Sequence, residues 1–308
     1  MKLATVLYAV LAAACGGAGG TQAPVMSTDF DGETALGYIK TQLEFGPRVP
    51  GSAGHRKTGD WITQMMQQRA DTVIEQRWTH RTVKGDTLPM RNILARFNPG
   101  ASQRILYVTH WDTRPISDNA LNLGDRMTPV PGANDGGSGT ALLIALGDAL
   151  KRSPLPPNVG LDLLFVDGED YGDFGRNEDV LIGSRYFAEH FPDSGYRPLF
   201  GVLWDMIGDR DLKIEQESHS LSRAPEVVQR VWKMASDLGY GRIFLAQEGQ
   251  SVTDDHIPLL DKGLRVIDVI DYDFGAHHTP RDTIDQVSAQ SLKVVGDVAL
   301  ALLRDVAR

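Results

Sequence analysis

An apolar segment that runs into two adjacent acids limits the folds open to this chain. Residues 161–166 read Leu-Asp-Leu-Leu-Phe-Val, and Glu169 and Asp170 follow closely. Ligands of open α/β sheets bind at the carboxyl ends of the strands, so two acids placed there can divide the work of holding a metal and moving a proton. An isolated acid pair is more often a solvated turn. The residues at the ends of the other predicted strands distinguish these two interpretations.

Three further predicted strands also end in side chains that can bind a metal or a proton. Because parallel strands bring their carboxyl ends to one edge of a sheet, we expect these side chains to lie close together. The strands are 105–109 before His110 and Asp112, 200–204 before Asp205, and 264–270 before His277 and His278. This repeated placement favours a functional site over a solvated turn.

Helix-like and strand-like patterns alternate from residue 27 to the carboxyl terminus. Such alternation predicts an α/β fold, a three-layer sandwich with a mixed, mostly parallel sheet flanked by helices. No second linker or repeat follows residue 27, so residues 30–308 are expected to form a single domain. The other predicted strands are 72–79, 92–97 and 161–166; the predicted helices run from a cap at 27–29 through Leu43, and over 55–69, 140–150, 182–190, 224–238 and 288–306.

The first residues are typical of an export signal. Lys2 precedes an apolar stretch, residues 3–14, that is too short to span a bilayer but fits a signal peptide. The residues before Cys15 resemble the bacterial lipoprotein signal, which implies a lipid anchor on Cys15 in a membrane and a location in the periplasm or cell envelope. Plain signal cleavage is the alternative, because the leucine lies four positions before Cys15 and the motif prefers three. We expect a signal over residues 1–15 and a flexible linker over 16–29.

Charge and cysteine content exclude two kinds of site. The net charge of −9 and the pI near 5.4 argue against a nucleic-acid partner, because an acidic surface repels phosphates. Cys15 is the sole cysteine. Since it belongs to the predicted signal, a cysteine-based zinc site and a disulfide framework are both excluded.

A glycine-rich segment, residues 130–139, opens the predicted helix 140–150. Its spacing is neither that of a P-loop nor that of a dinucleotide-binding loop. The glycines are better explained as a tight turn that holds Asp135 near the helix amino terminus and directs it at the site.

The polar residues at these strand ends and loops combine carboxylates with imidazoles, a donor set that suits zinc. A serine nucleophile is the rival chemistry, but Ser138 and Ser184 lie neither in a Gly-x-Ser-x-Gly turn nor beside an evident base. The candidate residues are His110, Asp112, Asp135, Glu169, Asp170, Asp205, Asp254, Asp255, His256, His277 and His278.

Six ordered motifs carry these residues: His110-Trp-Asp-Thr-Arg-Pro, Gly132-Ala-Asn-Asp-Gly-Gly-Ser, Asp167-Gly-Glu-Asp-Tyr-Gly, Leu203-Trp-Asp-Met-Ile-Gly, Asp254-Asp-His and His277-His-Thr. In this order they resemble the zinc aminopeptidase superfamily that contains the animal-type glutaminyl cyclases. The bacterial glutaminyl cyclases resemble the chain most, over about residues 30–308. The resemblance implies a zinc-dependent catalytic domain with the zinc aminopeptidase fold.

The resemblance also implies roles for individual residues. Asp135, Asp170 and His278 match the zinc ligands of the cyclases, and Glu169 matches their general acid/base. Asp254 and Asp205 match carboxylates of the proton-transfer network. The implied reaction converts the amino-terminal glutamine of a peptide or protein into pyroglutamate with release of ammonia, while zinc polarises the γ-carboxamide and Glu169 relays the proton.

Two departures bear on the substrate pocket and on the number of metals. His277 stands where the cyclases have tryptophan, and no tryptophan follows the acid pair, so the pocket is expected to use His277, Tyr171 and Phe174. His277 can line the pocket or point away from it. His110 and Asp205 complete, with bridging Asp135, the second zinc site of the aminopeptidases. One zinc ion per chain is expected, and two zinc ions per chain are the alternative.

Two other functions therefore remain alongside the cyclase. One is a di-zinc aminopeptidase, and the other is a non-catalytic envelope binding protein on an enzyme scaffold. Several candidates also have plain structural explanations. Asp112 and Asp255 can simply hold loops, His256 is expected to be packed, and Trp204 is expected in the core; the histidines outside every motif are His55, His80, His190 and His219.

Overall fold

The structure is a computed structural model that describes residues 30–306. The predicted signal peptide, Cys15, the linker through residue 29 and the predicted helix cap at 27–29 lie outside the described residues. Asp31 caps the first helix instead, since its carboxylate accepts the backbone N–H of Thr34 at 3.0 Å. None of the helices within residues 30–306 is long and apolar enough to cross a membrane.

A six-stranded sheet forms the middle layer, with its strands in the order β1-β2-β4-β3-β5-β8. β3 pairs in parallel with both β4 and β5, and β5 pairs in parallel with β8. β1 and β2 are antiparallel to their neighbours. The predicted mixed, mostly parallel sheet is confirmed; its strands are β1 (Thr72–Arg81), β2 (Thr87–Phe97), β3 (Gln103–His110), β4 (Val159–Val166), β5 (Phe200–Asp205) and β8 (Val266–Ile270).

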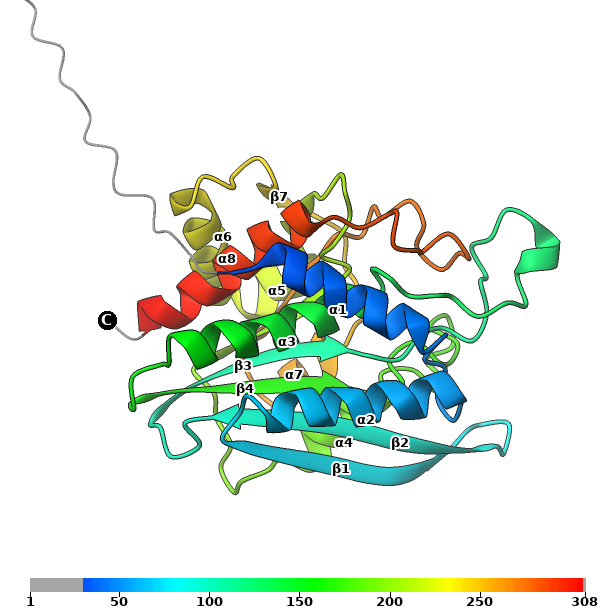
Figure 1. Cartoon of the computed structure of the whole chain (residues 1–308), viewed down its shortest axis with the longest axis horizontal. Coiled ribbons are helices and arrows are strands. Elements are labelled where there is room, and N and C mark those ends of the chain that lie inside the picture. Colours follow the sequence, from blue (N-terminus) through cyan, green and yellow to red (C-terminus); the bar gives the residue numbers. More distant parts are fainter. Residues whose placement is uncertain (1–29, 307–308) are drawn as a thin grey trace, which may run out of the picture.

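Helices cover both faces of the sheet and complete the three layers. Figure 1 shows α1, α2, α3 and α8 over one face, while α4 and α7 pack on the other. The bounds are α1 (Gly32–Glu44), α2 (Ala53–Gln67), α3 (Gly137–Arg152), α4 (Ile182–Glu189), α7 (His256–Asp261) and α8 (Ala289–Val306). The remaining elements are the helix α6 (Pro225–Asp237) and four shorter segments: η1 (Leu123–Asp125), β6 (Ile214–Gln216), α5 (Ser218–Arg223) and β7 (Phe244–Glu248).

Alternating side chains on the central strands build a core on each face. On β3, Tyr107 lies in the larger core under α3 and α8, while Leu106 and Val108 lie in the smaller core under α4 and α7. Period-two alternation buries both faces because helices cover both. The hydroxyl of Tyr107 donates to the carbonyl of Ala299 in α8 at 2.8 Å, which ties the strand to its covering helix.

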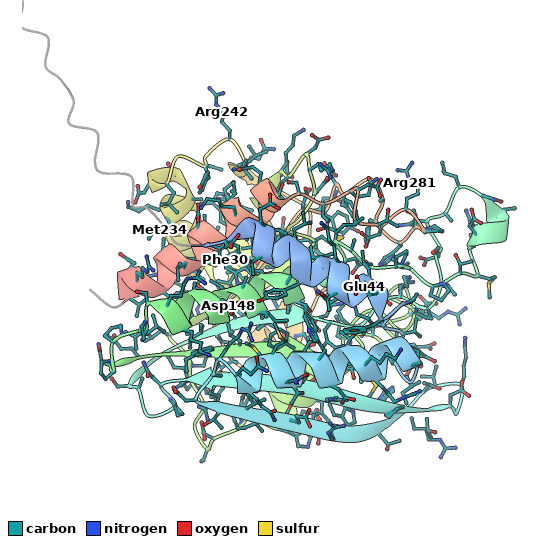
Figure 2. The ribbon with its side chains drawn as sticks, in the orientation of Figure 1. Phe30, Glu44, Asp148, Met234, Arg242 and Arg281 are labelled. Atoms are coloured by element: carbon teal, nitrogen blue, oxygen red, sulfur yellow. The ribbon has the colours of Figure 1, made fainter. Side chains whose placement is uncertain are left out.

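A polar contact joins three helices of the larger layer. Asp148 of α3, labelled in Figure 2, accepts hydrogen bonds from the hydroxyl of Tyr38 in α1 at 2.6 Å and from Arg69, just after α2, at 2.9 Å. Phe30 packs on Gly296 of α8, where an added Cβ would come within 2.2 Å of the Phe30 ring. These contacts hold the helices in register over the strands that carry the site.

The predicted elements are all present with small shifts at their ends, but β2 begins five residues earlier than predicted. Pro89 lies in that earlier part, outside the predicted strand 92–97. β2 pairs with β4 only from Ile93 onward, so the backbone of Pro89 has β1 as its single strand neighbour. Proline is tolerated there because no ladder hydrogen bond is lost on the open side.

The strand order creates a crevice at the carboxyl edge. From β3 the chain passes to β4 on one side, and later to β5 on the other. Ligands of open α/β sheets bind where the strand order reverses in this way. His110 ends β3 and Asp205 ends β5, so these two side chains come from the two strands that flank the crevice.

Candidate metal and acid/base site

Asp135 is positioned by the turn that precedes α3. Gly136 has a left-handed backbone (φ +70°), and an added Cβ there would lie 2.6 Å from the carbonyl oxygen of Asp112. The carboxylate of Asp282 accepts the backbone N–H of Asn134 at 2.8 Å and that of Asp135 at 3.1 Å. Glycine is therefore required at position 136, where the loop passes close to the backbone of Asp112 just after β3. Asp282 fixes the loop from the other side.

A buried arginine holds the same loop by its carbonyls. The guanidinium of Arg48 donates to the carbonyl oxygens of Trp111 at 2.8 Å, Gly132 at 2.7 Å and Asp135 at 3.1 Å. Burial lowers the pKa of Arg48 to about 10, although nearby carboxylates, Asp282 foremost, oppose the shift. Arg48 thus remains a cation at neutral pH and joins the two loops at the carboxyl edge.

Asp135 lies between two histidines. Its Oδ1 is 3.1 Å from Nε2 of His110, and its Oδ2 is 3.6 Å from Nε2 of His278. Nε2 of His110 is also 3.0 Å from Oδ1 of Asp205. Burial would raise the pKa of Asp135, but the hydrogen bond with His110 and the charges of both histidines hold the pKa below its usual value.

Asp170 meets Asp135 at His278. Oδ1 of Asp170 is 3.2 Å from Nε2 of His278, the nitrogen that also faces Asp135. The structure therefore brings together the three residues whose motifs match cyclase zinc ligands. Burial alone would lower the pKa of His278, but the charge of Asp170 and its neighbours raise it to about 10.

Asp118 and Arg114 form a second layer behind His278 and Asp170. Oδ1 of Asp118 is 3.5 Å from Nδ1 of His278. Arg114 donates to Asp118 at 2.6 Å and to Oδ1 of Asp170 at 2.8 Å. A carboxylate behind a histidine fixes the orientation of its ring and raises its basicity as a metal ligand. The sequence analysis missed both residues; Arg114 belonged to a quoted motif, but no pattern marked Asp118.

Asp112 holds the loop of the acid pair. Its carboxylate accepts the backbone N–H of Glu169 at 3.1 Å and that of Asp170 at 3.3 Å. Oδ1 of Asp112 is also 3.6 Å from Nδ1 of His110. Asp112 therefore anchors the loop and also lies beside the ring of His110.

Glu169 lies in the wall of a cavity of about 700 Å³ at the carboxyl edge of the sheet. Burial is the main cause that raises its pKa well above the usual value, and the charges of Asp170 and Asp254 raise it further against the opposing effect of His110. A carboxyl group that holds its proton near neutral pH is suited to general acid/base catalysis.

A group of buried acids continues from Glu169 into the protein. Burial, followed by the charge of Asp205, raises the pKa of Asp254 well above its usual value. Asp268 of β8 is fully buried, and burial together with the charge of Asp254 raises its pKa in the same way. Burial also raises the pKa of Asp255 to about 7. Adjacent buried carboxyls cannot all ionise, so this group retains protons.

The remaining walls of the cavity differ in part from the predicted pocket. His277 and Phe174 line the cavity, together with Asp205, Asp254 and His278. Tyr171 is not part of the cavity lining and packs instead against the Leu88, Met90 and Ile182 cluster. Tyr272, in the loop after β8, takes its place in the wall.

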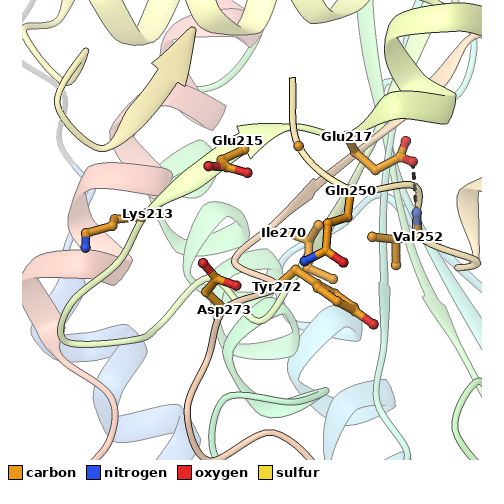
Figure 3. A pocket seen from close by; sticks show the side chains of 9 residues that line it. Lys213, Glu215, Glu217, Gln250, Val252, Ile270, Tyr272 and Asp273 are labelled. Carbon is orange, nitrogen blue, oxygen red and sulfur yellow. Dashed lines mark hydrogen bonds between the residues drawn. The ribbon is translucent and has the colours of Figure 1, made fainter. Parts of the chain in front are cut away.

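A second cavity of about 50 Å³ shares the Tyr272 wall (Figure 3). Within it Glu217 accepts the backbone N–H of Val252 at 3.1 Å. Glu217 also lies 3.3 Å from Nε2 of His256, which is fully buried. Burial would raise the pKa of Glu217, but the hydrogen bond with His256 contributes to lowering it to about 2. Burial lowers the pKa of His256, so His256 packs beside Glu217 as a neutral ring on the far side of this wall.

The residues at the carboxyl edge fit a divalent metal. Oδ2 of Asp135 and Oδ2 of Asp170 are buried and have no hydrogen-bond partner within residues 30–306. Leaving buried carboxylate oxygens unpaired is costly, and a cation removes the cost. Asp135, His277 and His278 bring ligand atoms within 4.8 Å of one another, and so do His110, Asp135 and Asp205. Oxygen and imidazole donors together suit zinc.

Comparisons with known proteins agree with this geometry. Residues 92–303 match the model of peptidase family M28. A glutaminyl-peptide cyclotransferase of Drosophila melanogaster is 26% identical over 275 residues, which are 81% of this chain and 75% of that protein.

Solved structures extend the likeness to almost the whole chain. The glutaminyl cyclase of Porphyromonas gingivalis has a TM-score of 0.87 and 34% identity, covering 91% of this chain and 99% of that chain. A Zn-dependent exopeptidase of Parabacteroides distasonis has a TM-score of 0.85 and 32% identity, covering 89% of this chain and 98% of that chain.

Proposed function

This chain belongs to peptidase family M28, and on that premise we propose that it is a zinc-dependent glutaminyl-peptide cyclotransferase. Its substrates are peptides or proteins with an amino-terminal glutamine, which it converts into pyroglutamate and ammonia. The observation that carries the proposal is the group of buried acids in which Glu169 and Asp254 share one cavity wall. A group of neighbouring carboxyls that holds both protons and negative charge can take a proton from one group of the substrate and return it to another.

Asp135, Asp170 and His278 would hold the zinc ion, with Arg114 and Asp118 fixing two of these ligands from behind. When bound there, zinc supplies a Lewis acid for the γ-carboxamide oxygen of the glutamine. The two carboxylates supply negative charge, and His278 supplies a neutral nitrogen once the metal replaces its proton.

Glu169 moves the proton in the proposed reaction. The α-amine nitrogen forms a bond to the carbonyl carbon of the γ-carboxamide, Cδ, and the bond from that carbon to the amide nitrogen breaks. Glu169 accepts a proton from the attacking amine and donates it to the leaving nitrogen, which departs as ammonia. Both reacting groups, the α-amine and the γ-carboxamide, belong to the same glutamine residue. Binding that residue in the cavity in a fixed conformation therefore brings the two groups close together.

Asp254 and Asp205 support Glu169 from the same cavity wall. The charge of Asp254 helps to raise the pKa of Glu169, so Glu169 gains basicity when Asp254 ionises. Asp205 in turn helps to keep Asp254 protonated. We infer that these two acids adjust the pKa of Glu169, so that Glu169 can accept a proton from the amine and donate it to the leaving nitrogen.

A second candidate function, a di-zinc aminopeptidase, is favoured by one observation. His110, Asp135 and Asp205 form a second group of ligand atoms, and it shares Asp135 with the first. Two metals bridged by a carboxylate can activate water for peptide hydrolysis. The same family includes peptidases, so this activity is the direct competitor.

The two functions predict different products from one protein. Purified zinc-loaded protein incubated with a glutaminyl peptide should release ammonia and give a product lighter by one ammonia. It should leave aminoacyl-anilides intact. Hydrolysis of aminoacyl-anilides without ammonia release, by a protein that retains two zinc ions per chain, would replace the cyclase with the aminopeptidase.

A further inference from the structure

His277 lies beside the proposed zinc ligands. It lines the same cavity as His278, and the centroids of the two imidazole rings are 3.9 Å apart. A ring nitrogen of His277, one of His278 and an oxygen of Asp135 all lie within 4.8 Å of one another. His277 therefore contributes a donor atom to the group in which His278 is already a proposed ligand.

The backbone explains how two consecutive residues face one point. Along an extended chain, neighbouring side chains point to opposite sides. His278 has a left-handed backbone (φ +53°), which is uncommon for a residue other than glycine. The N–H of His277 also donates to the carbonyl of Phe274 at 3.0 Å, which closes a turn. The turn and the left-handed residue together bring both rings to the cavity.

The imidazole of His277 has no hydrogen bond within the part of the chain that the structure describes. Its ring neighbours are His278 and Tyr272, whose centroid lies 5.9 Å away. The backbone carbonyl, by contrast, accepts from the side chain of Asn119 at 3.3 Å. The main chain of His277 is thus anchored while its ring nitrogens remain available as donors.

We propose that His277 is a fourth protein ligand of the metal held by Asp135, Asp170 and His278. This inference rests on the metal site of the proposed function, but not on the reaction. Two carboxylates and two imidazoles make a tetrahedral set of the kind zinc prefers. Ligand atoms of tetrahedral zinc stand about 3.3 Å apart. The atoms of this group lie within 4.8 Å of one another, so their separations have to shorten by at most about 1.5 Å.

Four protein ligands give the centre a different character from a site with three. A site with an open position takes water or substrate freely, whereas a closed site retains its metal firmly. With His277 bound, the substrate oxygen has to enter as a fifth ligand or displace the imidazole. Compared with a three-ligand site, this site would retain its metal more tightly and bind the substrate oxygen less readily.

X-ray absorption at the zinc edge tests the proposal without measuring activity. The zinc-loaded protein should show two imidazoles per zinc, and His277→Phe should show one. His190→Phe is the matched control, because His190 is exposed and stacks on Tyr186 at 4.0 Å, a contact that phenylalanine can keep. The control should retain two imidazoles per zinc.

Competition with a chelator gives a second, independent measurement. Losing a direct ligand should weaken zinc retention in His277→Phe by at least about tenfold, the lower end of what loss of a supporting residue alone costs. One imidazole in the unaltered protein, equal retention in the variant, or no zinc binding at all would each overturn the proposal. If a protein with one imidazole per zinc releases ammonia from a glutaminyl peptide, the cyclase function stands and only the fourth ligand is refuted. If a protein with two imidazoles per zinc releases no ammonia, the fourth ligand stands and the cyclase function is refuted.

Discussion

Asp118 approaches His278 from the side opposite the proposed metal, with 3.5 Å between Oδ1 of Asp118 and Nδ1 of His278. The other ring nitrogen, Nε2, faces Asp135 and Asp170. This arrangement of carboxylate, imidazole and metal position fixes which nitrogen carries the proton. With a metal bound at the proposed site, Asp118 would also influence the metal affinity without being a ligand.

We predict that Asp118→Asn weakens zinc binding by about 10- to 100-fold with little change in fold, because the amide supplies less negative charge to the imidazole. Chelator competition followed by circular dichroism measures both quantities. Asp305→Asn is the control, since Asp305 forms a surface ion pair with Arg230 at 3.1 Å. Equal zinc affinity in both variants would mean that Asp118 serves the loop alone.

Glu169→Gln should lower turnover of a glutaminyl peptide by about 100-fold or more, because the amide can neither accept nor donate the transferred proton. Zinc content should stay unchanged, since Glu169 is outside the proposed ligand set. Steady-state kinetics and metal analysis check the two statements. Glu189→Gln, an exposed acid at the end of α4, should behave as the unaltered protein. Near-native turnover of Glu169→Gln would remove Glu169 from the acid/base role.

Asp170→Ala and His278→Ala should each lose bound zinc and activity together, because a catalytic zinc site with three principal ligands does not tolerate a vacancy. Metal analysis after dialysis gives the zinc content, and ammonia release gives the activity. His80→Ala is a suitable control, because His80 pairs with Asp179 at 2.8 Å outside the cavity. Full zinc occupancy in both site variants would show that the metal is held by other residues.

Asp271→Asn should stabilise the protein at alkaline pH. Burial is the main cause that raises the pKa of Asp271 from 3.8 to about 7. Between those values the unfolded chain releases this proton and the folded chain keeps it, so the free energy of unfolding falls as pH rises and stays low above pH 7. Asparagine carries no such cost and keeps an acceptor for the N–H of Lys213, now 3.1 Å away.

The gain in unfolding free energy should be about 2 to 4 kcal/mol at pH 8 and close to zero at pH 4. Denaturant unfolding at the two pH values measures it. Asp211→Asn, an exposed acid in the same region, should show no comparable gain. A variant whose advantage is the same at pH 4 and pH 8 would mean that the buried charge is not its cause.

The sequence predicts the layers of this protein well because its central strands are apolar on both faces. Residues 161–166 are buried without exception, Asp162 included, as expected for a largely apolar strand that helices cover on both sides. The short elements were not predicted. α5 and α7 have six residues each, fewer than two helical turns, so their sequences show no clear period.

Sequence order identified the residues that end strands but not those that come from elsewhere to support them. Asp135 lies in the glycine-rich motif before α3, and Glu169 and His278 lie in motifs that follow strands. Arg48, by contrast, lies in a loop between α1 and α2, and Asp282 lies in the loop before α8. Only the folded chain shows that both hold the Asp135 turn. The same holds for Tyr171 and Tyr272: Tyr272 lines the cavity and Tyr171 packs against a hydrophobic cluster, and no local pattern distinguishes them.

The order of the strands also sets when the site can exist during folding. The hairpin of β1 and β2 joins neighbours in sequence, but β3 pairs with the much later β5, and β5 with β8. His277 and His278 follow β8, the last strand along the chain. The proposed metal ligands can therefore come together only after β8 has paired with β5, so the metal site depends on the last and least local strand pairing of the sheet.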